Sequence, residues 1–348
     1  MSLQFSVRYL LRTGLIARLA EFVVPVVLLG WDDPELKAEL EAAGAEVHPL
    51  RPVQRGVRYE RARSYMNLRY SSLLKSPSQP IWERRADLHR SFSTRIRRRL
   101  RKGLVEVGMA VPGASRWLCE TESRLFWEDT NAREIAAWTD SLRPDAVFSL
   151  TPFLQNEETV VRVASLRGVP MIASILSFDN ITARGWIAAT FNRYLVWNRH
   201  NAAELRRAYP HVPQSDIEIV GSPQFDFYYS QDYLWEQAEW RRRLSLPQDA
   251  PVILFGGGHY FCAPHEPNFL LQLDDAIENN EISKRAVILF RCHPVDPIGR
   301  WLPILKKTRH VVRDDPWKLT GASGQVNVRG SDIQKLASTL YYSRVHVN

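Results

Sequence analysis

Short apolar runs alternate with amphipathic segments along most of the chain. The runs consist mainly of Val, Ile, Leu and Phe, which is the pattern of strands buried on both faces of a parallel sheet. We expect strands at residues 25–30, 45–50, 145–151, 170–176, 194–197, 217–220, 252–258, 286–291 and 345–348. Apolar residues at helical spacing predict helices at residues 5–19, 33–44, 157–168, 232–246, 268–279 and 331–343. This alternation predicts an α/β fold.

The order of these elements predicts two Rossmann-like domains that face a cleft. We place an N-terminal domain at residues 1–222, with a basic helical insertion at 51–140, and a C-terminal domain at 223–348. The first helix begins almost at once, without a strand before it, and the last strand coincides with the end of the sequence. We therefore expect both ends to be truncated and the second domain to be partial.

The composition is that of an ordinary globular protein, with 45% hydrophobic and 24% charged residues among 348. No apolar run approaches the roughly 20 residues that a membrane helix needs. Three scattered cysteines do not form a disulfide framework and suit a reducing cytoplasm. We expect a cytoplasmic protein, and the sequence leaves its oligomeric state open.

The net charge of +8 is distributed unevenly. Residues 51–103 hold 16 Lys or Arg and three acidic residues, a balance of +13, which leaves −5 for the rest of the chain. Apolar residues recur there at helical spacing, at Trp82, Leu88, Phe92, Ile96, Leu100 and Leu104. Amphipathic helices with a solvated arginine face explain this pattern, and so does a surface that contacts phosphates or anionic lipid. No nucleic-acid-binding motif accompanies the charge, which disfavours nucleic acid as a partner.

In open α/β sheets, ligands bind beyond the carboxyl ends of the strands. Residues 177–185 follow one predicted strand, and they either cap a helix or bind a ligand at its N-terminus. Residues 221–226 follow another strand and form a connector, a hinge or a ligand contact. The candidates in these two segments are Asp179, Asn180, Thr182, Arg184, Gly185, Gly221, Ser222 and Asp226.

Two further strands end in residues suited to a phosphate. Gly256, Gly257 and Gly258, followed by His259, would let an anion approach main-chain NH groups. Arg291 and His293 could grip a phosphate from one side of an extended segment, or could be satisfied structural residues. Cys292 lies between them and is expected in the core. The spacing of Cys and His after residue 258 is not that of a known metal site, so we expect no metal.

Several of these segments occur in one series that resembles a known superfamily. The segments FSVRYLLRTG, SFDNITARG, GSPQFD, FGGG and RCHP are similar to those of the GT-B glycosyltransferase-like superfamily. The nearest group is that of bacterial CDP-glycerol glycerophosphotransferases and capsule polysaccharide transferases. Their usual SWDN(L)TSKG segment differs here at Phe178 and Arg184, and both changes keep the aromatic or cationic character.

The resemblance implies transfer of a sugar, or a related phospho-activated group, from a nucleotide donor of the UDP or CDP type. The acceptor would be a cell-surface polysaccharide or a lipid-linked molecule, with residues 51–103 contacting the anionic inner face of the membrane. Arg291 and His293 would bind the diphosphate, and Asp179 would act as the base with Glu157 behind it. No cofactor is implied. The alternatives are a UDP-sugar epimerase of the same fold and a non-catalytic binding protein.

Overall fold

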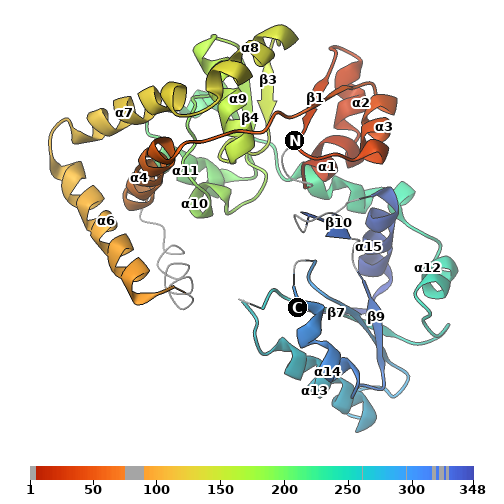
Figure 1. The fold of residues 1–348 in the computed structure, drawn as a ribbon. Coiled ribbons are helices and arrows are strands. Elements are labelled where there is room, and N and C mark those ends of the chain that lie inside the picture. The colour runs from red at the N-terminus through yellow and green to blue at the C-terminus, as the bar shows by residue number, and fades with distance from the viewer. Residues whose placement is uncertain are drawn as a thin grey trace. The chain divides into compact units, whose positions relative to one another are not determined.

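The computed structural model describes residues 5–74, 90–260, 262–294, 296–315, 319–320, 325–326 and 329–348. The chain divides into two compact units (Figure 1). The first unit comprises residues 1–6 and 14–223, and the second comprises residues 7–13 and 224–348. The sequence places a boundary at residue 223, but it does not indicate that residues 7–13 belong with the second unit. Each unit is built on a parallel sheet, so the expected α/β fold is confirmed.

The sheet of the first unit has four parallel strands in the order β3-β4-β5-β6. They are β3 (Val147–Ser149), β4 (Met171–Ser174), β5 (Arg193–Val196) and β6 (Ile217–Ile219). The connecting helices are α9 (Gln155–Leu166), α10 (Asn180–Ala183) and α11 (Arg199–Ala208). Met171, Ala173, Tyr194 and Val196 are fully buried between the helices, which explains why these strands form continuous apolar runs.

A parallel strand pair lies near the start of the first unit. It consists of β1 (Val26–Leu29) and β2 (Glu46–Pro49), with α2 (Leu15–Ala20) before it and α3 (Pro34–Ala42) between the strands. Asp33 caps α3 by accepting from the Leu36 amide at 3.1 Å, and Pro34 takes the first helical position. Leu28 packs with Ile135 and Val160, which joins this pair to the rest of the unit.

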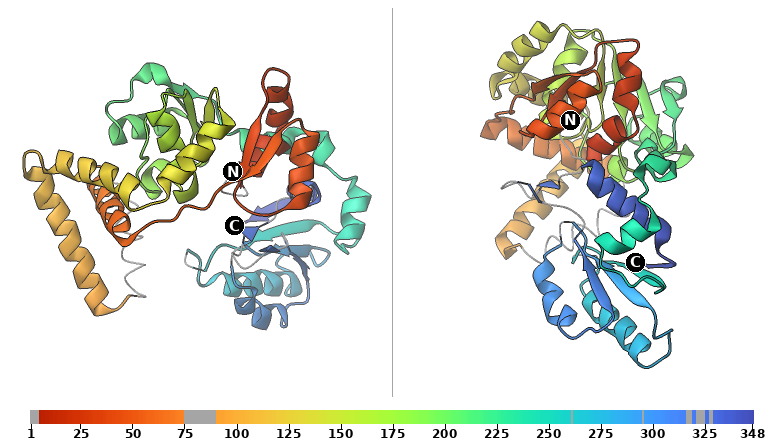
Figure 2. Two further views of the ribbon diagram at one scale, coloured as in Figure 1. Left: turned by 45° about the horizontal axis from the view of Figure 1, so that its top comes forward. Right: turned by 90° about the vertical axis from the view of Figure 1, so that its right-hand side faces the viewer.

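In the described residues between β2 and β3 the structure has four helices. They are α4 (Val57–Leu74), α6 (Phe92–Ala110), α7 (Ala114–Glu128) and α8 (Ala132–Leu142). Tyr59 of α4 packs with Leu125 and Phe126 of α7 and with Val163 of α9 in one buried cluster. Helix α6 extends away from the sheet of this unit in two views (Figures 1 and 2). No helix in the described ranges is both long and apolar enough to span a bilayer.

The sheet of the second unit has four parallel strands in the order β12-β7-β8-β9. They are β7 (Val252–Gly256), β8 (Val287–Arg291), β9 (Val311–Asp314) and β12 (Val345–Val347). The helices are α12 (Gln237–Arg243), α13 (Glu266–Glu278), α14 (Leu302–Leu305) and α15 (Gly330–Tyr342). Phe255, Leu270, Phe290 and Trp301 fill the core beside this sheet. A short antiparallel pair joins β10 (Leu319–Thr320) to β11 (Gln325–Val326).

Two expected helices differ in the structure. Residues 5–19 form α1 (Phe5–Val7), a π-helical turn η1 (Arg8–Arg12) and then α2, because Gly14 breaks the helix with a φ of +74°. Residues 232–246 contain only α12, and the 3₁₀ turns η3 (Pro223–Tyr229) and η4 (Gln231–Tyr233) precede it.

The start of α15 also differs, and the strands between β8 and α15 were not expected. The expectation that Ser331 and Asp332 cap α15 is wrong, since its N-cap is Arg329, without a side-chain cap. Strand β9 has no counterpart among the strands expected from the sequence.

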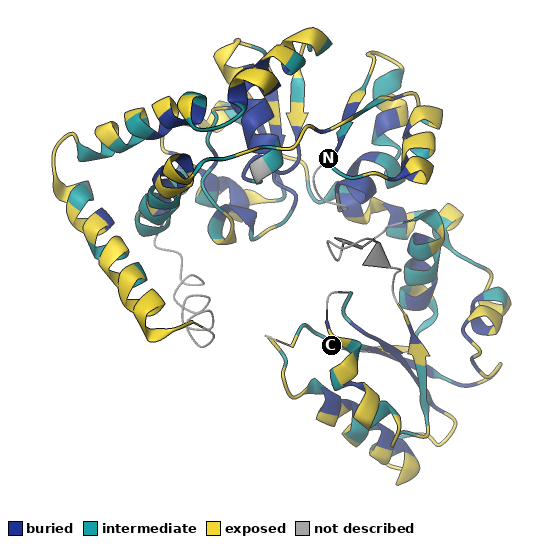
Figure 3. Ribbon diagram, viewed as in Figure 1, coloured by how far each residue is buried: buried dark blue, intermediate teal, exposed yellow. Residues whose placement is uncertain are grey.

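Most buried residues lie on the two sheets and on the helices that pack against them (Figure 3). The central strands β4, β7 and β8 are largely buried, whereas α6 is exposed along most of its length. Of the apolar residues that recur at helical spacing in the basic stretch, Trp82 and Leu88 lie outside the described residues. The other four are on α6 and are exposed, so their spacing marks a helix without marking a buried face.

Candidate functional site

The loop after β4, residues 177–186, is fixed by hydrogen bonds from two helices. Tyr70 of α4 donates its hydroxyl to the Ile181 carbonyl at 2.6 Å. Asn201 of α11 donates to the Phe178 carbonyl at 2.7 Å, and the Trp186 amide donates to Asn67 at 2.9 Å. These bonds hold the backbone of the loop at the carboxyl end of a parallel strand, where the sequence places a ligand site.

Asp179 lies half-buried in this loop, at the N-cap of α10. Its side chain makes no capping bond. Instead, Oδ1 accepts from the Ser177 hydroxyl at 2.8 Å and from the Asn180 amide at 3.3 Å. Thr182 donates its hydroxyl to the Asp179 carbonyl at 3.2 Å. The carboxylate of Asp179 therefore does not cap α10, although the sequence allows that role.

The other candidates in this loop are in different environments. Asn180 is buried and Arg184 is exposed. A Cβ atom at Gly185 would lie 2.8 Å from Asn67 Oδ1, so the glycine permits the close contact with α4. Gly185 is thus explained by packing within the first unit.

Glu157 has a structural role in the turn between β3 and α9. Its Oε2 accepts from the Ser149 hydroxyl at 2.8 Å and from the Thr151 amide at 3.0 Å, and the residue is buried. A carboxylate held by two such donors fixes the loop after β3. Glu157 therefore helps to position this loop, and its expected catalytic role stays a prediction.

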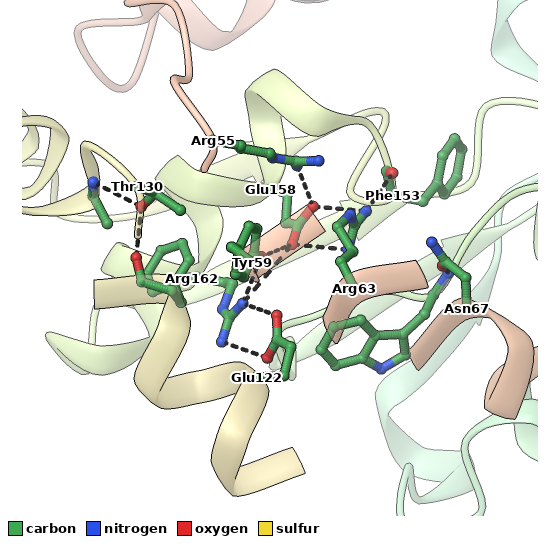
Figure 4. A network of polar contacts seen from close by, with 12 residues as sticks. Arg55, Tyr59, Arg63, Asn67, Glu122, Thr130, Phe153, Glu158 and Arg162 are labelled. Carbon is green, nitrogen blue, oxygen red and sulfur yellow. Dashed lines mark hydrogen bonds and ion pairs between the residues drawn. The ribbon is translucent and has the colours of Figure 1, made fainter. Parts of the chain in front are cut away.

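A buried cluster of charged residues, absent from the sequence-based candidates, lies beside these loops (Figure 4). Glu158 of α9 has no exposed side-chain surface and pairs with Arg55 at 2.9 Å and with Arg63 at 2.7 Å. Arg162 forms a two-bond pair with Glu122 of α7, at 2.6 and 3.1 Å. We call these five residues, with Tyr59, the Glu158 network.

Tyr59 connects the two halves of the Glu158 network. Its hydroxyl donates to Glu158 at 3.0 Å and accepts from Arg162 at 3.0 Å. Burial, together with the carboxylates of Glu158 and Glu122, raises the pKa of Tyr59, so the phenol remains a neutral donor. The acidic side chains of the network pair with its arginines, and these residues lie on or next to α4, α7 and α9. The network therefore holds these three helices together.

Residues 221–226 cross the division between the two units. Gly221 has a φ of +76°, a backbone conformation that favours glycine. The Ser222 hydroxyl is buried and has no hydrogen-bond partner within the described part of the chain. Asp226 is exposed in η3 and belongs to the second unit. These predicted ligand contacts therefore lie on separate units.

The glycine loop after β7 is shaped by packing and by one carboxylate. A Cβ atom at Gly257 would lie 2.9 Å from the ring of Trp301 and 3.2 Å from that of Phe290, so no larger residue fits there. The Gly258 amide donates to Oε2 of Glu266 at 2.6 Å. The expectation that this loop offers free NH groups to an anion is wrong for Gly258, because its NH group already donates a hydrogen bond to Glu266.

Asp296 organises the residues around the glycine loop. It accepts from the Tyr260 amide at 2.8 Å, from Arg300 at 2.6 Å and from the Trp301 indole at 2.7 Å. Burial alone would raise the pKa of Asp296, but these hydrogen bonds lower it. Arg300 also donates to the Gly258 carbonyl at 2.8 Å, so the loop is rigid at its base.

Two histidines face each other beside this loop. The rings of His259 and His293 meet edge to face, with centroids 5.7 Å apart. Burial and the neighbouring His259 lower the pKa of His293, so its imidazole is neutral near pH 7. A cavity of about 470 Å³ opens at the ends of β7 and β12, and Phe255, His265, Glu266 and Val347 are among the residues that line it.

Arg291 and Cys292 are both buried at the end of β8. The guanidinium of Arg291 forms an ion pair with Asp314 at the end of β9, and Lys335 of α15 contacts the same carboxylate. Arg291 therefore has an acidic partner within the sheet, and its expected binding of a phosphate stays a prediction. Burial raises the pKa of Cys292 to about 11, which agrees with its predicted place in the core.

Further cations surround Arg291, and sequence reasoning did not include them. Arg8, on η1, is buried, and its pKa is lowered by burial and by nearby Arg291. Arg12, on the same turn, lies close to Gly330 at the start of α15. Arg291, Arg329 and Lys335 all act on the carboxyl of Asp332, whose pKa burial raises.

These cations form one group at one edge of the sheet. We call Arg8, Arg12, Arg291, Arg329 and Lys335 the cationic cluster. With Asp314 and Asp332 it lies where β8 and β9 end and α15 begins, entirely within the second unit. Arg8 lies in a π-helical turn that the apolar spacing of the sequence does not predict. Among the described residues, no group of three or more Asp, Glu, His and Cys has an arrangement that could hold a metal ion.

The chain was compared with known families, curated proteins and solved structures. No model of a protein family matches it, and no curated protein does. Three solved structures that it resembles are UDP-GlcNAc 2-epimerases. That of Neisseria meningitidis has 9% identity and a TM-score of 0.42, with 66% of this chain and 59% of that one covered.

The other two epimerases are similarly distant. The Rickettsia bellii protein has 16% identity and a TM-score of 0.37, with 53% of this chain and 49% of that one covered. The Methanocaldococcus jannaschii protein has 14% identity and a TM-score of 0.38, with coverage of 62% and 58%. The matches thus span about half to three-fifths of those chains. They assign no substrate here, and they give no support to the specific resemblance to CDP-glycerol transferases.

Proposed function

We propose that the second unit binds the diphosphate of a nucleotide-activated sugar at the cationic cluster. The observation that carries this proposal is the gathering of five cations around two carboxylates, a local charge of +3, at the carboxyl edge of a parallel sheet. A sugar nucleotide carries two negative charges on its diphosphate, and arginines bind phosphates through paired hydrogen bonds. Open α/β sheets bind ligands at this edge.

The electrostatics of the cluster favour an anion. Arg8 and Arg291 are both buried, and burial, together with a smaller repulsion by Arg291, lowers the pKa of Arg8. A bound diphosphate would relieve that repulsion and would also interact favourably with the N-terminus of α15. Asp314 holds Arg291 and Lys335 in place while leaving the cluster with an excess of positive charge.

The first chemistry that we consider is transfer of the sugar to an acceptor. In this reaction the cationic cluster would stabilise the negative charge that develops on the leaving diphosphate. Asp179, on the first unit, is the candidate base for the acceptor, because its carboxylate is half-exposed and does not cap a helix.

Epimerisation of the sugar is the second chemistry, and one observation favours it. The loop after β7 brings a carboxylate and two imidazoles into one region, since Glu266 bonds to Gly258 and the His259 ring meets that of His293. Epimerisation requires removal and return of a proton, which such groups perform. The sequence identifies His259 and His293 as ligand-binding candidates but does not assign them, or Glu266, as acid and base groups.

A thermal-shift series tests the binding proposal. UDP, CDP and GDP, each with and without an attached sugar, should raise the melting temperature more than the matching monophosphates do, because the cluster binds a diphosphate. Arg329→Gln should reduce that shift. Arg309→Gln is the matched control, since Arg309 is exposed and pairs with Glu278 away from the cluster. Equal shifts with monophosphates and diphosphates, or an unchanged shift in Arg329→Gln, would overturn the assignment.

Product analysis then separates the two chemistries. The protein is incubated with a stabilising UDP-sugar without any acceptor, and proton NMR follows the sugar. Formation of an epimer establishes epimerisation and excludes the transfer-only mechanism. If the sugar stays unchanged without an acceptor, and is consumed only when a polysaccharide or lipid-linked acceptor is added, the reaction is transfer.

A further inference from the structure

Helix α6 carries a continuous stripe of exposed large apolar residues. Phe92, Ile96, Leu100, Leu104 and Val107 follow one another at intervals of four or three residues, so they share one face of the helix. Their exposed fractions are 71%, 41%, 63%, 65% and 67%. Single exposed apolar residues are common on protein surfaces, but an aligned series of five on one helix marks an interaction surface.

Cations border this stripe on both sides. The α-helical period places Arg97 and Arg101 along one border and Arg95 and Arg99 along the other. All four are exposed, and none forms an ion pair with an acidic residue of the described ranges. Glu106 is the one acidic residue in the helix. The exposed surface of α6 is therefore apolar in the middle and positively charged at both margins.

The opposite side of α6 attaches the helix to the first unit. Val105 lies on that side and is buried, and α6 packs against α4 and α7. The apolar stripe consequently lies on the exposed side of α6, a helix that is exposed along most of its length (Figure 3). A helix of 19 residues is about 28 Å long, so this surface is long enough to lie along a flat partner.

We propose that α6 binds an anionic lipid bilayer, lying in the plane of its interface. An interfacial helix buries its apolar face among the acyl chains to about 5–10 Å, while long arginine side chains reach the headgroups from the margins. Anionic lipids attract those arginines. Charge complementarity favours an anionic bilayer over two other partners. A second copy of α6 would bring like charges together, and a nucleic acid would leave the apolar stripe uncovered.

Co-sedimentation of the whole protein with vesicles tests the proposal. We expect binding to phosphatidylcholine vesicles that contain phosphatidylglycerol, weaker binding to phosphatidylcholine alone, and loss of binding as salt increases. Substituting Arg95, Arg97 and Arg101 by Gln should lower the partition coefficient on the order of 100-fold. Substituting Ile96, Leu100 and Leu104 by Ser should lower it at least about tenfold.

A matched control lies on α11 of the same unit. Replacing Arg199, Arg206 and Arg207, all exposed, by Gln removes the same charge and should leave vesicle binding within about threefold of the wild type. Amide hydrogen exchange should slow within residues 92–110 when anionic vesicles are added, which locates the contact. Both the triple substitutions on α6 change exposed side chains, so unaltered unfolding curves verify that the fold is kept.

Three results would overturn the proposal. The first is equal binding to neutral and anionic vesicles, or none to either. The second is unchanged binding after the Ser substitutions. The third is a dimer, seen by sedimentation velocity, that the Ser substitutions dissociate while vesicle binding persists, which would make a second copy of the chain the partner of the stripe.

Discussion

Helices α4 and α6 lie in the most basic part of the chain. Arg58 and Arg61 of α4 are exposed, but two other arginines at this helix are in an environment opposite to that of the arginines of α6. Arg63 of α4, and Arg55 just before it, are buried and pair with Glu158, 95 or more residues further along the chain. The arginines of α6 at positions 95, 97, 99 and 101 are exposed. The difference shows that a basic stretch of sequence can have two structural roles. Its arginines stabilise the fold where acidic residues distant in sequence pair with them, and they form a charged surface where none does.

The largest expected effect comes from removing the shared carboxylate of the Glu158 network. Glu158→Gln leaves Arg63 buried without its counter-charge and leaves Arg55 with Glu60 as its acidic partner, which should lower the free energy of unfolding by about 3 kcal/mol. Denaturant unfolding measures this loss. Arg97→Gln on α6 is the control and should change stability by no more than about 0.5 kcal/mol. Similar losses in both variants would show that the two helices do not differ as described.

Two glycine substitutions should change the free energy of unfolding by smaller amounts and in opposite directions. A Cβ at Gly56, just before α4, would lie 2.2 Å from Oδ1 of Asp129, whose other oxygen accepts from the Tyr59 amide at 2.8 Å. Gly56→Ala should therefore destabilise the protein by about 1–3 kcal/mol. Gly103, within α6, has open space around it, and Gly103→Ala should stabilise that helix by about 0.5–1 kcal/mol.

These two substitutions are measured by different methods. Denaturant unfolding reports the Gly56→Ala loss, and hydrogen exchange of the α6 amides reports the Gly103→Ala gain, since α6 opens locally. A gain in stability from Gly56→Ala would contradict the tight packing at the start of α4.

The smallest effect concerns the hydroxyl that joins the two halves of the network. Tyr59→Phe removes the hydrogen bonds to Glu158 and from Arg162, while every charge keeps another partner. We expect a loss of about 1 kcal/mol in the free energy of unfolding. Tyr229→Phe changes a side chain that is 90% exposed and should have no effect. A Tyr59→Phe loss as large as that of Glu158→Gln would indicate that the phenol, not the ion pairs, holds the helices together.

The sequence predicts the sheets well because their signal is local. Continuous apolar runs identify β4, β7 and β8, and Gly168, with a φ of +71°, ends the helix before β4 where expected. The break at Gly14 and the π-helical turn before it were not predicted, because apolar spacing there fits one uninterrupted helix.

The polar parts of the site were harder to predict. Arg291 was identified from the sequence, but its burial against Asp314 depends on the neighbouring strand β9, which the sequence did not reveal. Arg8 lies 283 positions before Arg291, and only the tertiary structure brings the two charges together. The same holds for the Glu158 network, whose members come from three separate segments of the chain. Ion pairing between distant segments leaves no periodic trace in a single sequence.

The most direct test of the account is phosphorus NMR of UDP titrated with the protein. If the cationic cluster binds the diphosphate, both phosphorus resonances of UDP should shift or broaden with wild-type protein. They should respond far less with the Arg329→Gln variant at the same concentration. A response confined to the uracil protons, or phosphorus resonances that respond equally with the variant, would contradict diphosphate binding by the second unit.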